Sequence, residues 1–549
     1  MTRTRNAIGR VKPKPSAAAP PVRVPLANAS EPPGRTPPAA SVWERFHTGV
    51  AGKRVDAPAA PPLNRFAETM FTVGAQAFMA GQPEAAEISL RMSIGAGGND
   101  FAALGLLGLM AIERKDFAAA AGWLRAALVV NPDEPTTLNN LGEALRRDDQ
   151  FDAAIACYRR ALAVAPDYAD AYDNLGCALA MSNRPAEALA QHHRAIALKP
   201  EFALAHERLS EALVGLNRHE AALRALRLGM TWEPDQPKAR LNEAYILLAL
   251  GRFALGWKAY EARWDAVIDG VPALRRHGDR PRLHRSTRLA GKTLLLHAEQ
   301  GFGDTLQFVR YAPMLTHAGA RVIVEAQAPL VALLRSAPGV TQVVAIDDPL
   351  PAFDLQCPLL SLPLACGTTL ASIPAEVPYL TPSPERIAAW RRRLGRRRAG
   401  RRRIAIAWSG NPDHANDRNR SIPLRQVLSF LDRSDGELHV AQTQIRTADR
   451  STLDQWPEVT DHSAALQDFA DTAALLSLMD LVICVDTAVA HVAGAMARPT
   501  WLLLPFSAEW RWLVGRSDTP WYPTMRLFRQ AAPGDWDSVL AAVAQALDE

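Results

Sequence analysis

The sequence predicts two architectures in one chain: an N-terminal α-helical solenoid, then an α/β region made of two halves. Prolines recur at a fixed interval through much of the first half of the chain. After about residue 290, short apolar runs alternate with helix-like segments, a pattern typical of parallel sheets. A chain of 549 residues is too long for one hydrophobic core. We therefore expect several domains.

The solenoid is predicted over residues 67–266, as about six repeats of a helical hairpin. The prolines that mark its period are Pro132, Pro166, Pro200 and Pro234. Small residues of the first helices keep the same phase: Gly74, Gly108, Gly142, Gly176, Ser210 and Ala244. Those of the second helices are Ala86, Ala120, Ala154, Ala188, Ala222 and Gly256. This spacing is the period of tetratricopeptide repeats, whose end repeats are usually less regular.

The concave face of such a solenoid is expected to hold a protein partner. Four polar residues on the predicted first helices are candidates to line it: Asn139, Asn140, Asn174 and Arg208. The alternative is that these side chains are simply exposed to solvent.

Two segments flank the solenoid. Residues 1–63 are rich in Pro, Ala and Arg, and such a composition buries too little apolar surface to offset the entropy of ordering. We expect a disordered, solvated tail, although its basic residues could touch acidic surfaces. Residues 267–289 are polar, basic and rich in turns, and are expected to form the junction to the next domain.

The α/β region divides into a first half, 290–383, a helix with an arginine-rich linker, 384–403, and a second half, 404–549. Strands of the first half are predicted at 293–297, 321–325 and 341–346. Strands of the second half are predicted at 404–408, 438–442, 481–485 and 500–504. Two halves joined by a linker imply a cleft between them. Ligands of open α/β sheets bind at the carboxyl ends of strands.

The first candidate motif is Gly301-Phe302-Gly303-Asp304, which follows the first strand. It lacks the third glycine of a dinucleotide fingerprint, because that position is Leu306. Asp304 could cap the following helix, or act as a general base in the cleft, or do both. Gly301 and Gly303 would clear space for a substrate, with Gln307 on the same, acceptor side. Nicotinamide binding stays a minor alternative, since Glu325 ends the second strand.

The second motif is the polar loop after the strand at 404–408, which includes Ser409, Gly410 and Asn411. Arg418 and Arg420 follow it, and a guanidinium binds phosphate oxygens bidentately. We expect these residues to contact a diphosphate; a solvated loop is the alternative. The same donor-binding role is assigned to Ser421 and to Gln442.

The third motif, Asp486, Thr487 and His491, lies where a buried strand turns into a helix. The amino end of a helix attracts phosphate. His491 could instead be a packed, hydrogen-bonded core histidine. The fourth motif is the aromatic loop that contains Arg511 and Trp512, placed on the acceptor side. An indole there could stack on a sugar or simply pack.

Composition restricts the remaining possibilities. The net charge of +5 is only mildly basic, so nucleic acid is not an expected partner. Five cysteines form no C-x-x-C pair, so no metal site is expected. No apolar run approaches the ~18 residues of a membrane helix. No secretory signal is evident, so the expected compartment is the cytoplasm, with peripheral membrane contact through the arginine-rich segments as an option.

Four stretches together resemble the tetratricopeptide-repeat glycosyltransferases of bacteria: AEQGFGDTLQFVRYAPML, AWSGNPDHANDRNRSIPL, DFADTAALLSLMDLVICVDTAVAHVAGA and EWRWLVGRSDTPWYPTMRLFRQ. The catalytic part of that family is similar to the lipopolysaccharide heptosyltransferases, with the GT-B fold of two Rossmann-like halves. The resemblance implies a nucleotide-sugar donor, inverting transfer, and no metal or permanently bound cofactor.

The resemblance also assigns residues. Asp304 matches the family's proposed base, and Arg420 lies where heptosyltransferases keep a phosphate-binding lysine. Asp486, Thr487 and His491 match the diphosphate motif D-[ST]-x-x-x-H. The sequence departs from the pattern at Ala488, where the family usually has glycine. It also departs at 440–443, which reads VAQT in place of SLQK, and its first half is shorter.

The function expected from these patterns is transfer of a sugar from a nucleotide-sugar to an acceptor hydroxyl. The repeats would recruit a protein acceptor, and the resemblance to protein O-glycosyltransferases includes enzymes whose acceptor is flagellin. One alternative is a heptosyltransferase-like enzyme that builds lipopolysaccharide or another surface glycan. A second alternative is a non-catalytic adaptor, which the intact Asp304, Arg420, Thr487 and His491 disfavour.

Overall fold

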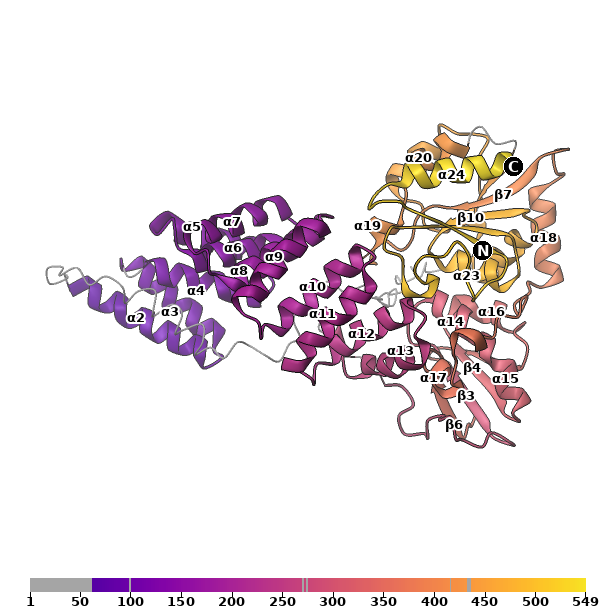
Figure 1. Ribbon diagram of the computed structural model, residues 1–549, viewed down its shortest axis with the longest axis horizontal. Coiled ribbons are helices and arrows are strands. Elements are labelled where there is room, and N and C mark those ends of the chain that lie inside the picture. Colours follow the sequence, from indigo (N-terminus) through magenta and orange to yellow (C-terminus); the bar gives the residue numbers. More distant parts are fainter. Residues whose placement is uncertain (1–61, 98–99, 269–270, 273–274, 415, 432–435) are drawn as a thin grey trace, which may run out of the picture.

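The computed structural model describes residues 62–549 except 98–99, 269–270, 273–274, 415 and 432–435. The tail predicted to be disordered therefore lies almost wholly outside the described residues. Twelve consecutive helices come first in the described chain, and an α/β region with two parallel sheets follows (Figure 1). The predicted fold class is confirmed.

Within the described residues, the solenoid consists of six helical hairpins. Their helices are α2 (Pro62–Met79) and α3 (Pro83–Gly95), α4 (Asp100–Glu113) and α5 (Phe117–Val130), α6 (Pro135–Arg147) and α7 (Phe151–Val164), α8 (Ala169–Met181) and α9 (Pro185–Leu198), α10 (Ala203–Gly215) and α11 (His219–Trp232), α12 (Pro237–Ala249) and α13 (Phe253–Tyr260). The helices of a hairpin pack closely where the sequence has small residues: a Cβ on Gly108 would lie 2.6 Å from Leu124.

Two glycines of the solenoid should respond oppositely to replacement by alanine. A Cβ on Gly142 would lie 2.6 Å from the buried ring of Tyr158, whereas Gly122, inside α5, has no heavy atom within 4 Å of that position. We expect Gly142→Ala to lower the free energy of unfolding by about 1–3 kcal/mol through overpacking. Gly122→Ala should raise it by up to about 1 kcal/mol through helix propensity. Urea unfolding followed by circular dichroism measures both; equal effects of the two substitutions would contradict the close packing.

The first parallel sheet has the strand order β5-β4-β3-β6. Its strands are β3 (Thr293–His297), β4 (Arg321–Ala326), β5 (Val340–Ala345) and β6 (Leu355–Pro358). The helices of this half are α14 (Phe302–Phe308), α15 (Ala312–His317), α16 (Val331–Leu334) and α17 (Leu362–Cys366). The chain adds β4 on one side of β3 and later returns to add β6 on the other. The strand order therefore reverses at β3.

The second parallel sheet has the order β12-β11-β10-β7-β8-β9. Its strands are β7 (Arg402–Ala407), β8 (Gly436–Val440), β9 (Thr460–Asp461), β10 (Leu481–Val485), β11 (Thr500–Leu504) and β12 (Met525–Arg529). Neither β6 of the first sheet nor β9 and β12 of the second was predicted. In this sheet the order reverses between β7 and β10.

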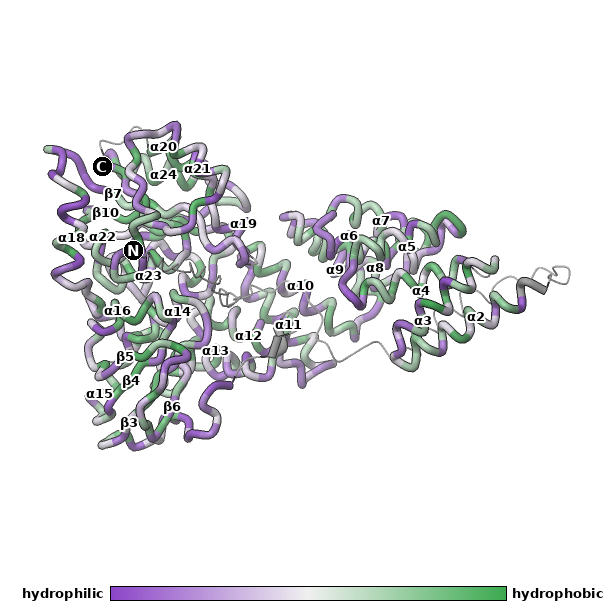
Figure 2. The backbone as a smooth tube through the Cα atoms, turned by 180° about the vertical axis from the view of Figure 1, so that it is seen from behind, coloured by the Kyte–Doolittle hydropathy of each residue, from purple (hydrophilic) through white to green (hydrophobic). Residues whose placement is uncertain are grey.

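Helices cover both faces of the second sheet, so its central strands are buried. The helices are α18 (Pro384–Leu394), α19 (Asp417–Arg420), α20 (Leu424–Leu431), α21 (Thr447–Leu453), α22 (Phe469–Ser477), α23 (Ala488–Ala495) and α24 (Trp536–Asp548). Ile404 and Ile406 of β7 pack with α20 and α24, while Ala405 and Ala407 pack with α22 and α23. The hydrophilic helix α18 lies at the outer surface (Figure 2).

The last repeats of the solenoid pack on the α/β region. Trp257 of α13 lies edge to face with Trp510 at 5.3 Å and with Phe308 at 6.1 Å. The turn between α10 and α11 also makes contact, because Asn217 Nδ2 donates to the carbonyl oxygen of Phe506 at 2.5 Å. Helices α10–α13 are thus joined to the α/β region, and the start of α7 also approaches it, because Phe151 lies near Arg418. Helices α2–α5 extend away from it (Figure 1).

Candidate functional site

The strand order places three of the predicted motifs at the reversal points of the two sheets. Gly301–Asp304 follows β3, Ser409–Gly410 follows β7, and Asp486–Thr487 follows β10. In open α/β sheets the crevice at such a reversal is where ligands bind. The candidate site is therefore the region where these three loops approach one another.

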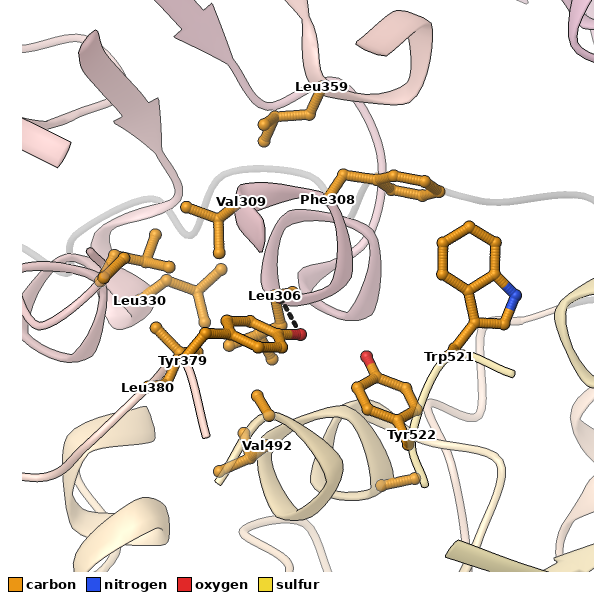
Figure 3. Close-up of a cluster of buried hydrophobic side chains, with 14 of the residues drawn as sticks. Leu306, Phe308, Val309, Leu330, Leu359, Tyr379, Leu380, Val492, Trp521 and Tyr522 are labelled. Carbon is orange, nitrogen blue, oxygen red and sulfur yellow. Dashed lines mark hydrogen bonds between the residues drawn. The ribbon is translucent and has the colours of Figure 1, made fainter. Parts of the chain in front are cut away.

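The two halves meet where α14 and α23 pack together. Figure 3 shows Leu306 of α14 and Val492 of α23 in one apolar cluster, where the Tyr379 hydroxyl donates to the Leu306 carbonyl oxygen at 3.0 Å. A Cβ on Gly303 would lie 2.7 Å from Cδ2 of His491. The space that Gly303 was predicted to clear for a substrate is thus filled by the His491 ring.

His491 is buried, and its Nδ1 lies 2.9 Å from the hydroxyl of Tyr522. Burial lowers the pKa of His491 well below its ordinary value, and the positive charges of Arg511 and Arg310 lower it further. The imidazole is therefore neutral at physiological pH. This geometry matches the alternative of a packed, hydrogen-bonded histidine.

Asp304 is held at both carboxylate oxygens. Oδ2 accepts a hydrogen bond from the Gly301 backbone N–H at 2.8 Å, which caps α14. Oδ1 pairs with the guanidinium of Arg511, which reaches across from the second half in helix η7 (Trp510–Trp512). Burial raises the pKa of Asp304, although Arg511 opposes that shift. The cap is present, and the carboxylate stays available as a candidate base.

Arg511 is the centre of this cluster. Its Nε donates to Gln307 Oε1 at 2.8 Å, and it also pairs with Glu509. Burial raises the pKa of Glu509 to about 8, although the positive charge of Arg511 opposes that shift. The loop assigned to the acceptor side therefore contacts the predicted base directly. Glu509 was not predicted as a site residue.

The phosphate side is formed by Arg420, Gly410 and the amino end of α23. Arg420 Nη1 donates to the carbonyl oxygen of Asp486 at 3.2 Å, and a Cβ on Gly410 would lie 2.7 Å from Arg420 Nη2. Among the described residues, the buried hydroxyl of Thr487 has no hydrogen-bond partner. A cationic group and an unsatisfied hydroxyl thus lie together at the start of a helix, an arrangement that suits an anion.

Several predicted donor-binding residues support this loop from behind. Ser421 Oγ accepts from the Gly410 N–H at 3.0 Å and donates to Asp417 Oδ1 at 2.7 Å. Gln442 Oε1 accepts from the Trp408 N–H, and its Nε2 donates to Ser409 Oγ, both at 3.0 Å. These side chains fix the loop that carries Gly410. Asp417, which holds Ser421, was not found from the sequence.

Other predicted residues lie elsewhere. Arg418 is exposed, and its guanidinium lies 5.8 Å from the ring of Phe151 in the solenoid. Asn411 is exposed, and its side chain accepts from the Asp413 N–H at 3.1 Å. Trp512 is completely buried and packs near His491, so it presents no face to a sugar. Both carboxylate oxygens of Glu325 are paired, one with Arg276 and the other with His277, so Glu325 is not free to bind a ribose.

The candidate residues of the solenoid form a ladder from repeat to repeat. Asn174 Nδ2 donates to Asn139 Oδ1 at 3.0 Å, and Arg208 Nη1 donates to Asn174 Oδ1 at 3.3 Å. Arg208 is buried and pairs with Asp173. Asn140 is partly exposed beside this ladder. The alternative of simple exposure to solvent does not hold for Asn139 and Arg208, because both are buried; their place on a partner-binding face stays a prediction.

Among the residues that the structure describes, one group of potential metal ligands is found, in the solenoid: Asp173, Cys177 and His192. Asp173 is already satisfied by Arg208 and by His192 Nδ1 at 2.8 Å. Burial raises the pKa of Cys177 to about 12, so the thiol stays protonated. The donor set does not suit a cation, because the charge of its one carboxylate is already neutralised by Arg208.

The arginine-rich linker runs outside the candidate site. Arg397 pairs with Asp480, and Arg403 pairs with Glu437 at 3.0 Å. Over the part of the chain that the structure describes, no helix is both long and apolar enough to cross a membrane.

Comparisons with known proteins match both parts of the chain. Models of the tetratricopeptide repeat match residues 77–135 and 133–201. The model of glycosyltransferase family 9 (heptosyltransferase) matches residues 464–503, which contain α22, β10 and α23. The predicted pairing of tetratricopeptide repeats with a heptosyltransferase-like region is thereby confirmed.

A curated relative is Protein FlbA of Caulobacter vibrioides, 26% identical over 355 residues, which are 57% of this chain and 55% of that protein. The chain thus spans about half the length of this relative. Similar solved structures include MamA from Desulfovibrio magneticus RS-1 (22% identity, TM-score 0.30, 32% of this chain and 98% of that chain). Another is PilF of Pseudomonas aeruginosa (15% identity, TM-score 0.32, 36% of this chain and 90% of that chain).

Proposed function

We propose that this protein is a glycosyltransferase that moves a sugar from a nucleotide-sugar donor to an acceptor hydroxyl. The observation that carries the proposal is the juxtaposition of Arg420, Gly410 and the unpartnered Thr487 hydroxyl at the reversal point of the second sheet. The group that best fits these donors is a diphosphate, the leaving group of such a reaction. The family 9 match over β10 and α23 supports the same reading.

The proposed reaction is a direct displacement at the anomeric carbon, which inverts its configuration. Arg420 and the amino end of α23 stabilise the negative charge of the departing diphosphate. Asp304, across the contact between the halves, takes the proton of the acceptor hydroxyl. His491 packs on Gly303, so a substrate can enter between them only if the two halves separate. Such closure and opening is common where a site lies between two bodies.

The solenoid is proposed to recruit a protein acceptor. The resemblance to protein O-glycosyltransferases suggests an acceptor of the flagellin type. Tetratricopeptide repeats form extended binding surfaces, and helices α2–α9 present far more surface than one hydroxyl acceptor requires. A second candidate, synthesis of lipopolysaccharide or another surface glycan, is favoured by the heptosyltransferase description of the matched family. The nucleotide-sugar is a substrate in both cases.

Arg420→Ala tests the diphosphate site. Its loss should weaken binding of the best nucleoside diphosphate among UDP, ADP, GDP and CDP by about 10- to 100-fold, because hydrogen bonds to charged groups contribute about 1.5–3 kcal/mol. Binding of the corresponding nucleoside should change little. Isothermal titration calorimetry measures the dissociation constants of both the nucleoside diphosphate and the nucleoside.

Arg418→Ala is the matched control, since it removes an arginine two residues away that faces Phe151. It should leave both affinities unchanged. An equal loss of affinity for the nucleoside and its diphosphate in Arg420→Ala would rule out the phosphate role.

A further inference from the structure

Arg511 connects the two α/β halves inside the candidate site. It belongs to the second half, yet its guanidinium pairs with Asp304 and with Gln307 of the first. Asp304, Gln307 and Arg511 are all buried. The contact therefore lies in a medium of low polarity, where the interaction of charges is strong.

The guanidinium has little freedom in this position. Its central carbon lies 4.2 Å from the centroid of the Trp510 ring, and Glu509 pairs with its other edge. Stacking and three polar partners define one orientation for Arg511. Asp304 Oδ2 is fixed separately by the Gly301 N–H at 2.8 Å. The plane of the Asp304 carboxylate is thus set by one backbone group and one side chain.

We propose that Arg511 is a positioning residue: it orients the Asp304 carboxylate and places a positive charge against it inside a buried site. This inference rests on the proposed function, in which Asp304 is the base. A base must be both correctly oriented and unprotonated at the working pH. Arg511 supplies both conditions through the same contact.

The charges around Asp304 determine the direction in which its pKa should move when the charge of Arg511 is removed. Burial raises the pKa of Asp304, and Asp486 at the start of α23 raises it further; Arg511 lowers it, as does Arg263 of η1 (Glu261–Trp264). Of the other groups in the cluster, burial lowers the pKa of His491 and raises that of Glu509, so it favours the neutral form of both. Removing the charge of Arg511 should therefore raise the pKa of Asp304. The base would then stay protonated to a higher pH.

The first experiment needs no donor. The protein is labelled with ¹³C at the aspartate carboxyl carbons, and Asp304→Asn assigns the signal of Asp304 by its loss. In Arg511→Gln the Asp304 signal should titrate at a higher pH than in the unaltered protein. Arg511→Lys keeps a positive charge, so Asp304 should titrate close to the pH at which it titrates in the unaltered protein. Arg516→Gln, which removes a half-exposed arginine paired with Asp518, should change nothing.

A purely structural role predicts a different result. Arg511→Gln would then be less stable, yet the titration of Asp304 would not move, and this outcome overturns the proposal. Loss of one partner of a buried ion pair is strongly destabilising, so Arg511→Gln could fail to fold. In that case Arg511→Lys decides: an unchanged kcat would overturn the positioning role, whereas a fall of about 10-fold in kcat with little change in KM supports it.

Activity measurements separate the proposed glycosyltransferase function from the positioning role of Arg511. If the unaltered protein releases nucleoside diphosphate from a nucleotide-sugar, the acid limb of its pH profile should move to higher pH in Arg511→Gln. If the unaltered protein turns over no nucleotide-sugar while the Asp304 titration still depends on Arg511, the proposed function fails and the electrostatic coupling stands. If turnover occurs and its acid limb is the same in both proteins, the positioning role is wrong.

Discussion

Asp304→Asn should lower the rate of sugar transfer by about 10²–10⁴-fold, the usual contribution of a general base. Binding of a nucleoside diphosphate should stay nearly normal, because its proposed contacts are with Arg420 and Thr487 in the other half. The measurement compares kcat for release of nucleoside diphosphate with the dissociation constant from calorimetry. We expect kcat to fall while the dissociation constant stays nearly unchanged.

The control for this substitution is folding. Asparagine keeps an oxygen that can accept the Gly301 N–H, so the cap on α14 can persist. It does leave the buried Arg511 without one of its two acidic partners, which itself destabilises the protein. The thermal unfolding temperature must therefore be measured alongside. A folded Asp304→Asn protein with near-normal turnover would leave Asp304 with the capping role alone.

Removal of residues 1–199 should abolish modification of a protein acceptor while sparing the binding of nucleoside diphosphate. Recruitment by the solenoid raises the local concentration of the acceptor, and such tethering contributes about 10²–10⁴-fold. The cut lies before α10, because the α10–α11 turn contacts the α/β region through Asn217 and Phe506. Intact-mass measurement of a co-expressed acceptor detects the added sugar.

The shortened chain needs its own control. Slow hydrolysis of the donor should continue, since water replaces the acceptor and the site residues are all retained. A folded, nucleotide-binding chain of residues 200–549 that modifies the acceptor as well as the full chain would contradict the recruitment role. Loss of both nucleotide binding and modification would instead show that the cut had damaged the α/β region.

The sequence by itself determined the solenoid, because its contacts are local. Gly142 meets Tyr158 and Gly108 meets Leu124, each pair sixteen positions apart within one hairpin. A repeated spacing of small residues and prolines therefore predicts both the helices and their close packing. The strand-loop-helix motifs at Asp304, Gly410 and Thr487 were predictable for a similar reason: each lies within one strand and the segment that follows it.

The tertiary structure alone decided how those motifs combine. The short strand β6 has no distinctive pattern in the sequence, yet its place beside β3 shows where the strand order of the first sheet reverses. Asp304 and Arg511 are 207 positions apart and join only because the two halves pack through α14 and α23. The burial of Trp512 likewise depends on that packing. No local periodicity in the sequence predicts such contacts, because they arise from the packing of elements that are distant in the chain.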